Sequence, residues 1–194
     1  MVGGFANLGP TYMKVKKAQR NATDAALASI KDIGDEWAAL VGRSFDHVEC
    51  FGMEDAERAI VVLGSAAGNA RAVARRLRDA GEKVGVVKLR TYRPFPLIEL
   101  GKALQGVRAL AVLDRAETFS APAGPLALDV MTALYAMGVS VPLRSYIYGL
   151  GGADVKLEYM TQVFDDLKKV ATGEEGDVRE GLCLNDSPRF LGIA

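Results

Sequence analysis

One glycine-rich segment carries residue types that bind anions. Gly64-Ser65-Ala66-Ala67-Gly68-Asn69 follows a short apolar run and opens a helical pattern. Free backbone N–H groups at such a helix start could hold a phosphate or a carboxylate. The segment lacks the GxGxxG spacing and the lysine of a phosphate-binding loop, so a helix capped by Ser65 is the alternative interpretation. We take Gly64, Ser65, Gly68 and Asn69 as a candidate anion site, and expect no cofactor there.

Arginines follow two further apolar runs. Arg90, Arg93 and the pair Asp114-Arg115 are expected at the same sheet edge as the glycine-rich segment. A guanidinium fork can bind a carboxylate, a phosphate or a neighbouring subunit. Aromatic residues close by in the sequence add apolar surface, which favours docking and makes these four residues candidates for an interface.

Nucleophilic and metal-dependent chemistry has little support. A Ser-His-Asp triad needs histidine, and the chain has a single one, His47. His47, Glu49 and Cys50 form the nearest approach to a metal-binding cluster, but strand alternation places Cys50 on the opposite face, so an ordinary edge strand is the simpler interpretation. Cys50 and Cys183 form no CxxC motif. We predict no catalytic residue and no metal ligand in this chain.

Composition restricts the class of protein. The 194 residues carry 24 basic and 24 acidic side chains, and 49% are hydrophobic, which is typical of a globular protein. Zero net charge gives no broad attraction for nucleic acid, and no apolar run is long enough to span a membrane. The start of the chain lacks the pattern of a signal peptide. We expect a cytoplasmic protein that binds neither nucleic acid nor membrane.

The elements that must position these residues alternate between strand and helix. A helical pattern over 13–41 places Ile30, Ile33, Trp37, Leu40 and Val41 on one predicted buried face. The mixed stretch 45–51 is a predicted edge strand, and the arginine row 71, 75, 78 a predicted solvated helix face. Apolar runs then predict buried strands at 59–63, 84–89, 109–113 and 143–148, each followed by a helical pattern. Asp154 is the expected N-cap of the last helix, and Gly149 to Gly152 a tight turn before it.

This alternation predicts an α/β fold: an open, doubly wound, mostly parallel sheet with flanking helices, preceded by a long N-terminal helix. The expected divisions are a helical segment at 1–44 that ends a preceding domain, the α/β domain at 45–173 and a C-terminal tail at 174–194. In such sheets ligands bind at the carboxyl ends of the strands, where the glycine-rich segment and the arginines fall.

Several strings together resemble a known family. They include Arg90-Thr91-Tyr92-Arg93-Pro94-Phe95-Pro96, Leu113-Asp114-Arg115-Ala116-Glu117 and Tyr148-Gly149-Leu150-Gly151-Gly152. With Gly64 to Gly68 and Tyr12-Met13, they resemble the C-terminal part of pyruvate (2-oxoacid):ferredoxin oxidoreductase α subunits, over roughly residues 10 to 168.

The resemblance implies a domain similar to the C-terminal domain of transketolases, with an assembly role in a thiamine-diphosphate-dependent enzyme. In that family a 2-oxoacid is oxidatively decarboxylated to acyl-CoA. Thiamine diphosphate, Mg, iron–sulfur clusters and coenzyme A would then belong to other domains or subunits, and ferredoxin would accept the electrons. This chain alone would be inactive, with a possible homodimer in isolation. The alternative is a free-standing flavodoxin-like module that binds a nucleotide or flavin through the 64–69 loop.

Overall fold

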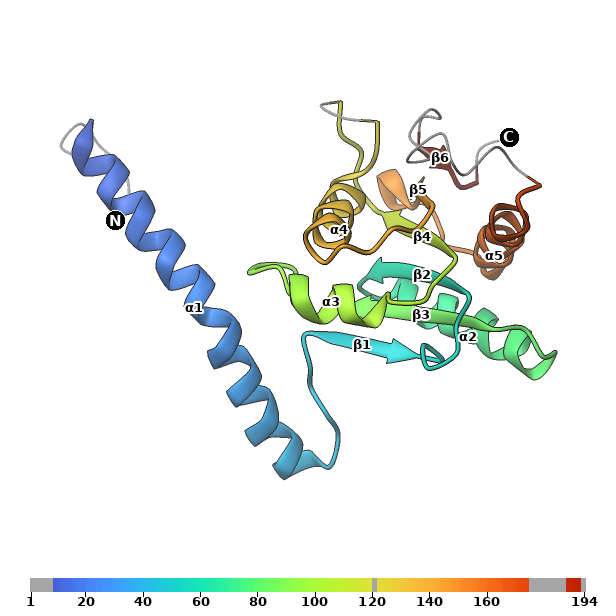
Figure 1. Cartoon of the computed structure of the whole chain (residues 1–194), viewed down its shortest axis with the longest axis horizontal. Coiled ribbons are helices and arrows are strands. Elements are labelled where there is room, and N and C mark those ends of the chain that lie inside the picture. The colour runs from blue at the N-terminus through green and yellow to red at the C-terminus, as the bar shows by residue number, and fades with distance from the viewer. Residues whose placement is uncertain (1–8, 120–121, 175–187, 193–194) are drawn as a thin grey trace. The chain divides into compact units, whose positions relative to one another are not determined.

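The computed structural model describes residues 9–119, 122–174 and 188–192 (Figure 1). These residues form two compact units. One comprises the described residues up to His47 together with Thr91–Pro96, and the other comprises Val48–Arg90 and the described chain from Leu97 onward. None of the described helices is long and apolar enough to cross a membrane.

The first unit is built around α1 (Pro10–Val41). Pro10 occupies its first turn, and Gly42 ends it in the left-handed conformation with its N–H bonded to Ala38 O at 2.8 Å. The segment after the helix returns closely along it, because a methyl group at Gly34 would lie 2.3 Å from the carbonyl oxygen of Phe45. Glycine at position 34 therefore permits that approach.

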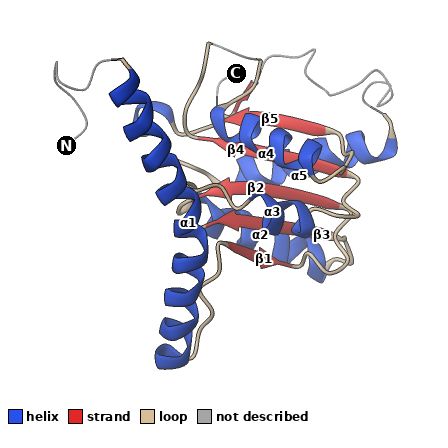
Figure 2. Ribbon diagram, turned by 60° about the vertical axis from the view of Figure 1, so that its left-hand side comes forward, coloured by secondary structure: helices blue, strands red, loops and turns tan. Residues whose placement is uncertain are grey.

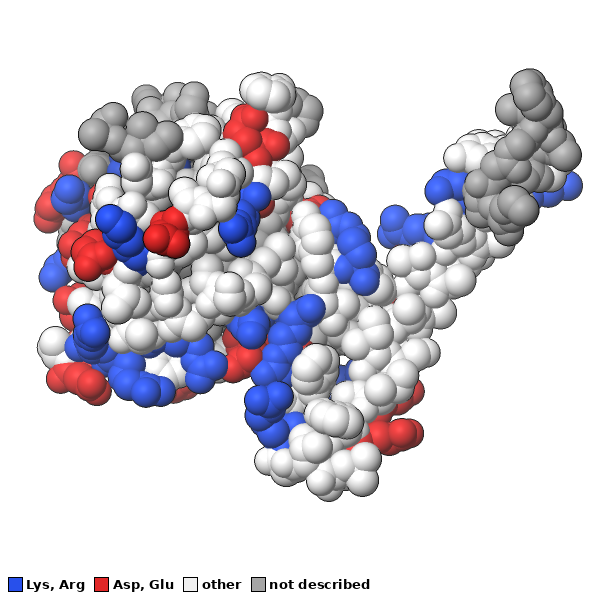
Figure 3. Space-filling model, turned by 180° about the vertical axis from the view of Figure 1, so that it is seen from behind, with Lys and Arg blue, Asp and Glu red and all other residues white. Residues whose placement is uncertain are grey.

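The predicted buried face of α1 is wrong for the described chain. Ile33, Trp37 and Leu40 are 65%, 51% and 81% exposed, and Val41 is also exposed. Periodicity identifies the apolar side of a helix, but it does not say whether anything covers that side. Figure 3 shows this helix largely uncharged along much of the side that it presents there.

The second unit is a six-stranded, mostly parallel sheet with helices on both faces (Figure 2), as the alternating pattern predicted. Its strand order is β1-β3-β2-β4-β5-β6. The strands are β1 (Val48–Phe51), β2 (Arg58–Leu63), β3 (Val84–Leu89), β4 (Ala109–Asp114), β5 (Leu143–Ile147) and β6 (Arg189–Phe190). The connecting helices are α2 (Ala66–Asp79), α3 (Leu97–Ala103), α4 (Pro125–Ala136) and α5 (Leu157–Thr172).

Helix α2 packs with α5, and α3 packs with α4, so the two pairs form separate layers on the sheet. The strands β2 and β4 in the middle of the sheet are almost entirely buried, because both of their faces are covered by helices. Figure 3 shows basic and acidic side chains interspersed on the visible surface of this unit.

The edges of the sheet differ in detail from the sequence predictions. Strand β1 is an edge strand, but it starts at Val48 and runs antiparallel to β3, so His47 lies just before it. At the other edge, Arg189 and Phe190 of the predicted tail pair with β5 as a parallel strand. The tail residues 175–187, including Cys183, lie outside the described residues.

Two helix-level predictions are also wrong. The arginine row of α2 is not simply solvated: Arg71 pairs with Glu49, and Arg78 donates to the Gly52 and Val84 carbonyl oxygens. Asp154 does not cap α5, whose N-cap position is Lys156. The short 3-10 helix Leu150–Gly152 precedes Asp154, and α5 begins only at Leu157.

Candidate functional site

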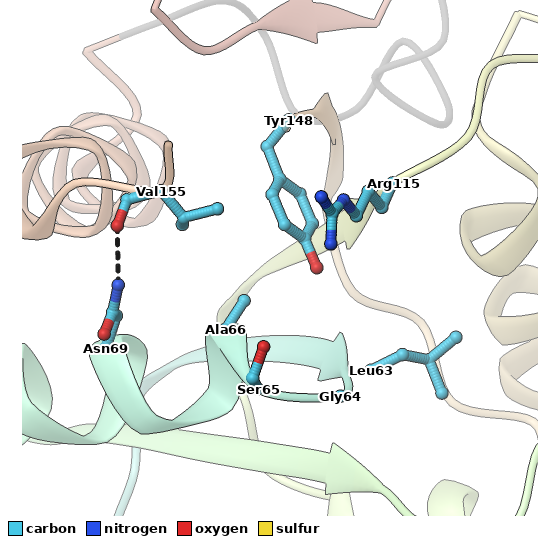
Figure 4. A pocket seen from close by; sticks show the side chains of 8 residues that line it. All are labelled: Leu63, Gly64, Ser65, Ala66, Asn69, Arg115, Tyr148 and Val155. Atoms are coloured by element: carbon cyan, nitrogen blue, oxygen red, sulfur yellow. Dashed lines mark hydrogen bonds between the residues drawn. The ribbon is translucent and has the colours of Figure 1, made fainter. Parts of the chain in front are cut away.

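A pocket of about 380 Å³ lies at the carboxyl edge of the sheet (Figure 4). Three neighbouring strands contribute to it, because the segments that follow β2, β4 and β5 all emerge there. From β2 the chain crosses to β3 on one side and later to β4 on the other, so the strand order reverses at this place. Open α/β sheets bind ligands at such reversal points. The lining residues are Leu63, Gly64, Ser65, Ala66, Asn69, Arg115, Tyr148 and Val155.

The floor of the pocket is the start of α2. Gly64 turns the chain out of β2 with φ +69°, a conformation that glycine adopts without strain. Ser65 occupies the N-cap position, but its side chain makes no capping hydrogen bond, so the capping interpretation is wrong in its mechanism. The first turn of α2 carries no acidic residue. Its free N–H groups therefore give this end of the helix a positive partial charge.

Asn69 ties α2 to the segment before α5. Its side-chain amide donates to Val155 O at 2.7 Å (Figure 4). This bond holds Val155, which forms part of the wall, against the helix. Asn69 thus has a structural role at the edge of the pocket. Gly68, the remaining residue of the predicted anion site, does not line the pocket.

Arg115 reaches the pocket from the end of β4. Its Nε donates to Gly149 O at 3.1 Å, which fixes the direction of the guanidinium group. Gly149 has φ +63°, and a methyl group there would lie 3.3 Å from Arg115 Nε, so glycine leaves room for this arrangement. The bond uses one donor of the five that a guanidinium carries.

Tyr148 was missed as a site residue. It is 5% exposed, and its hydroxyl points into the pocket beside Arg115 (Figure 4). Burial raises the pKa of Tyr148; the charge of Arg115 opposes that rise, and the charge of Asp114 adds to it. The hydroxyl therefore stays protonated at neutral pH and can donate a hydrogen bond. A tyrosine directly after an apolar strand was the available signal, since parallel strands end at this edge.

Asp114, an interface candidate, lies buried at the start of α4. Its carboxylate accepts the N–H groups of Leu126 at 2.7 Å and Ala127 at 3.1 Å. Burial raises the pKa of Asp114 and outweighs the lowering effect of these two N–H groups. This carboxylate therefore faces a helix of its own chain.

Arg90 and Arg93, the other interface candidates, also have partners within the chain. Arg90 binds the Glu49 carboxylate, with Nη2 to Oε2 at 2.6 Å, and Arg71 pairs with the same side chain. Burial would raise the pKa of Glu49, but the adjacent arginines lower it. Arg93, in the first unit, stacks over Tyr92 with 4.0 Å from its guanidinium carbon to the ring centroid. Arg93 and Arg115 remain exposed.

The described residues offer no set of ligands for a metal ion or an iron–sulfur cluster. Across residues 9–119, 122–174 and 188–192, no group of three or more His, Cys, Asp and Glu side chains is placed to hold a metal ion. Cys50 is exposed, and Nδ1 of His47 lies 3.0 Å from Thr91 Oγ1 in the first unit. These residues do not fit magnesium-bound thiamine diphosphate or an iron–sulfur cluster, so no reaction step through either is assigned to them.

The fold and the pocket define an α/β domain of doubly wound type, and comparison with known proteins gives its family. Residues 56–160 match the family described as pyruvate:ferredoxin oxidoreductase core domain II. The chain belongs to this family, which confirms the resemblance found in the sequence.

Individual relatives agree with this assignment. The chain is 38% identical to the NADH-dependent phenylglyoxylate dehydrogenase subunit alpha of Aromatoleum evansii, over 89% of its own length and 42% of the relative. It is 36% identical to the pyruvate synthase subunit PorA of Thermotoga maritima, over 98% of its length and 45% of the relative. The chain thus spans less than half the length of these relatives.

A solved structure supports the fold. The 2-oxoglutarate:ferredoxin oxidoreductase of Magnetococcus marinus, determined with 2-oxoglutarate, coenzyme A and succinyl-CoA bound, superposes with a TM-score of 0.50 at 18% identity. The match covers 85% of this chain and 24% of that one. At this identity the likeness concerns the arrangement of helices and strands.

Proposed function

We propose that this chain is a structural and assembly domain of a 2-oxoacid:ferredoxin oxidoreductase. The observation that carries the proposal is the match along nearly the whole chain to α-type subunits that are more than twice as long. The chain would then work with portions equivalent to the remainder of those subunits, which supply the reaction centre.

In the proposed complex a 2-oxoacid loses carbon dioxide, coenzyme A receives the acyl group, and ferredoxin receives the electrons. Thiamine diphosphate, magnesium and iron–sulfur clusters would be held outside this chain. The relatives are named for phenylglyoxylate and pyruvate, so their names support 2-oxoacids as a class and pyruvate as one candidate substrate. We also propose that the protein is cytoplasmic and that the isolated chain forms a homodimer.

The apolar face of α1 is the part of the first unit best suited to assembly. Ile33, Trp37 and Leu40 follow one another at the spacing of a single helical face and are all at least half exposed. Aromatic and large aliphatic side chains are enriched at the centres of protein interfaces. We therefore assign this face to contact with the other domains or subunits. Arg93 and Arg115 are proposed as interface residues as well.

The test is co-purification of this chain with the remaining subunits and domains of its complex. Leu40→Glu places a charge on the apolar face and should abolish or sharply reduce recovery of the complex. Ala28→Glu adds the same charge to an exposed position on the other side of α1 and should leave recovery unchanged. Circular dichroism verifies that both variants fold. Failure of the wild-type chain to co-purify, or wild-type recovery of Leu40→Glu, contradicts the assembly role.

The flavodoxin-like alternative stays a separate prediction. It requires that the purified chain carry a flavin, which absorbs visible light, or bind a nucleotide that raises its melting temperature. Colourless protein with no nucleotide-dependent shift would remove this alternative and leave the assembly role standing.

A further inference from the structure

The pocket at the start of α2 collects hydrogen-bond donors that lack acceptors. The backbone N–H groups of Ala66 and Ala67 make no hydrogen bond with any residue that the structure describes. Such groups at the first turn of a 14-residue helix carry the positive end of its dipole. A helix start alone is an ordinary feature of an α/β fold, so the surrounding side chains must show whether a ligand binds there.

Tyr148 is the independent observation. Its side chain is 95% buried, yet within the described part of the chain nothing accepts or donates a hydrogen bond at its hydroxyl. The oxygen itself is not among the fully buried, unpaired side-chain atoms of the described residues, so it is open to the pocket and its hydrogen is available to an acceptor there. The hydroxyl points into the pocket, so a ligand there would supply the missing partner.

Arg115 gives the pocket a full positive charge. Its Nε is used by Gly149 O, and among residues 9–119, 122–174 and 188–192 no acceptor engages its terminal nitrogens. Ser65 adds a hydroxyl that makes no capping bond. No carboxylate lines the pocket, so nothing in the lining offsets this charge.

We propose that this pocket binds a phosphate group, with Ala66 N–H, Ala67 N–H, Tyr148 and Arg115 as its donors and Ser65 beside them. The donors come from the start of a helix and from two other strands, and so they approach from several directions. A tetrahedral phosphate offers acceptor oxygens in several directions, whereas a planar carboxylate offers two in one plane. The pocket volume of about 380 Å³ leaves room for a larger molecule attached to the phosphate.

The experiment is a titration of the full chain with inorganic phosphate at constant ionic strength, followed by amide chemical shifts in NMR spectra. Saturable shifts should concentrate at Gly64, Ser65, Ala66 and Ala67. Sodium chloride at the same ionic strength should not reproduce them. Absence of saturable shifts at this segment, or stronger shifts elsewhere, overturns the proposal, and this result needs no variant.

Two variants and one matched control sharpen the test. Arg115→Gln and Tyr148→Phe should each weaken phosphate binding about tenfold, the loss expected for one hydrogen bond to a charged group. Arg108→Gln removes the same charge just before β4, at its opposite end, and should leave the affinity unchanged. Equal loss in Arg108→Gln would show a general charge effect and overturn the site. The dispersion of the amide spectrum shows whether each variant is folded.

Other ligands identify the source of the phosphate. Adenosine monophosphate binding more tightly than inorganic phosphate at the same amides would show that the site serves a nucleotide, and equal affinity that it serves the phosphate group alone. Both results support the proposal. Acetate binding as tightly as phosphate would overturn it in favour of a carboxylate site. None of these outcomes depends on whether the chain joins an oxidoreductase complex.

Discussion

Asp114 caps helix α4 from the end of the neighbouring strand: its Oδ1 accepts the N–H of Leu126 at 2.7 Å. The same carboxylate accepts the N–H of Ala127, so one buried side chain satisfies the first two N–H groups that follow Pro125, which has none of its own. This contact joins β4 to α4. Asp114 is also the residue directly before Arg115, which lines the pocket.

Removing that cap should weaken the fold. Asp114→Ala leaves both N–H groups without their acceptor, and we expect the free energy of unfolding to fall by about 1–2 kcal/mol. Asp114→Asn retains one acceptor oxygen and should lose less. Urea denaturation of the three proteins gives the comparison. An alanine variant as stable as the wild type would contradict the capping role.

The cap also has a pH signature. Because the pKa of Asp114 is raised in the folded protein, mainly by burial, the part of its stabilisation that depends on the bound proton is present below the ordinary pKa of 3.8 and is lost as pH rises through the folded pKa, while the two capping hydrogen bonds remain. Asp114→Asn does not titrate and lacks this loss. As pH rises above 3.8, the free energy of unfolding of the wild type should therefore fall relative to that of Asp114→Asn. Parallel stability curves would contradict the raised pKa.

Gly124 is required by the same capping carboxylate. A methyl group there would lie 2.3 Å from Asp114 Oδ2 and 2.7 Å from its Cβ, so the start of α4 would have to move. Gly124→Ala should cost about 1–3 kcal/mol of stability. Gly68→Ala is the control, because a methyl group at Gly68 meets nothing within 4 Å and alanine favours a helix. If both variants lower the urea midpoint equally, the clash is not the cause.

Tyr146 holds the last helix and the edge strand together. Its hydroxyl donates to Asp166 Oδ2 at 2.9 Å, and Arg189 of β6 donates to the same oxygen at 3.0 Å. Tyr146→Phe should lower the free energy of unfolding by about 1–2 kcal/mol, because a buried acceptor loses a partner.

Burial, followed by the charge of Asp166, raises the pKa of Tyr146. Stability from a raised pKa is present below the ordinary value of 10.0 and is lost as pH rises through the folded pKa. The wild type should therefore lose stability above that pH more steeply than Tyr146→Phe. Thermal unfolding across alkaline pH measures this, and identical slopes would rule it out.

Glu82 neutralises the buried Arg58. The two side chains form a salt bridge, and Arg58 also donates to Phe164 O at 3.1 Å. The hydrogen bond from Arg58 is the main cause that lowers the pKa of Glu82. A lowered pKa gives stability that is present above the ordinary 4.5 and is lost as pH falls through the folded value.

Glu82→Gln should accordingly lose about 1–3 kcal/mol at neutral pH, since it leaves a buried guanidinium without its charge partner. It should also show a flatter decline toward acid than the wild type. Glu36→Gln, an exposed change on α1, should alter neither property. Urea midpoints at neutral and acidic pH separate these outcomes.

The sequence by itself determined the order and type of the main elements. Apolar runs such as Ala59 to Leu63 and Ala109 to Leu113 are buried strands, because strands covered on both faces carry no polar alternation. The helices that follow them could be predicted from the spacing of their apolar residues. The position of Gly64 and Arg115 at the carboxyl edge could be predicted because parallel strands all end at the same edge. The family resemblance was carried by strings in these connecting segments.

Tertiary structure alone decided which of those segments meet. Local patterns do not encode strand order, and the order β3-β2-β4-β5 brings Gly64, Arg115 and Tyr148 to one pocket while Arg90 pairs with Glu49 on β1. The pairing of Arg189 with Asp166 likewise depends on contacts distant in the sequence. Periodicity marks the side of a helix or strand that is apolar, but burial depends on what else packs there, as exposed Trp37 shows.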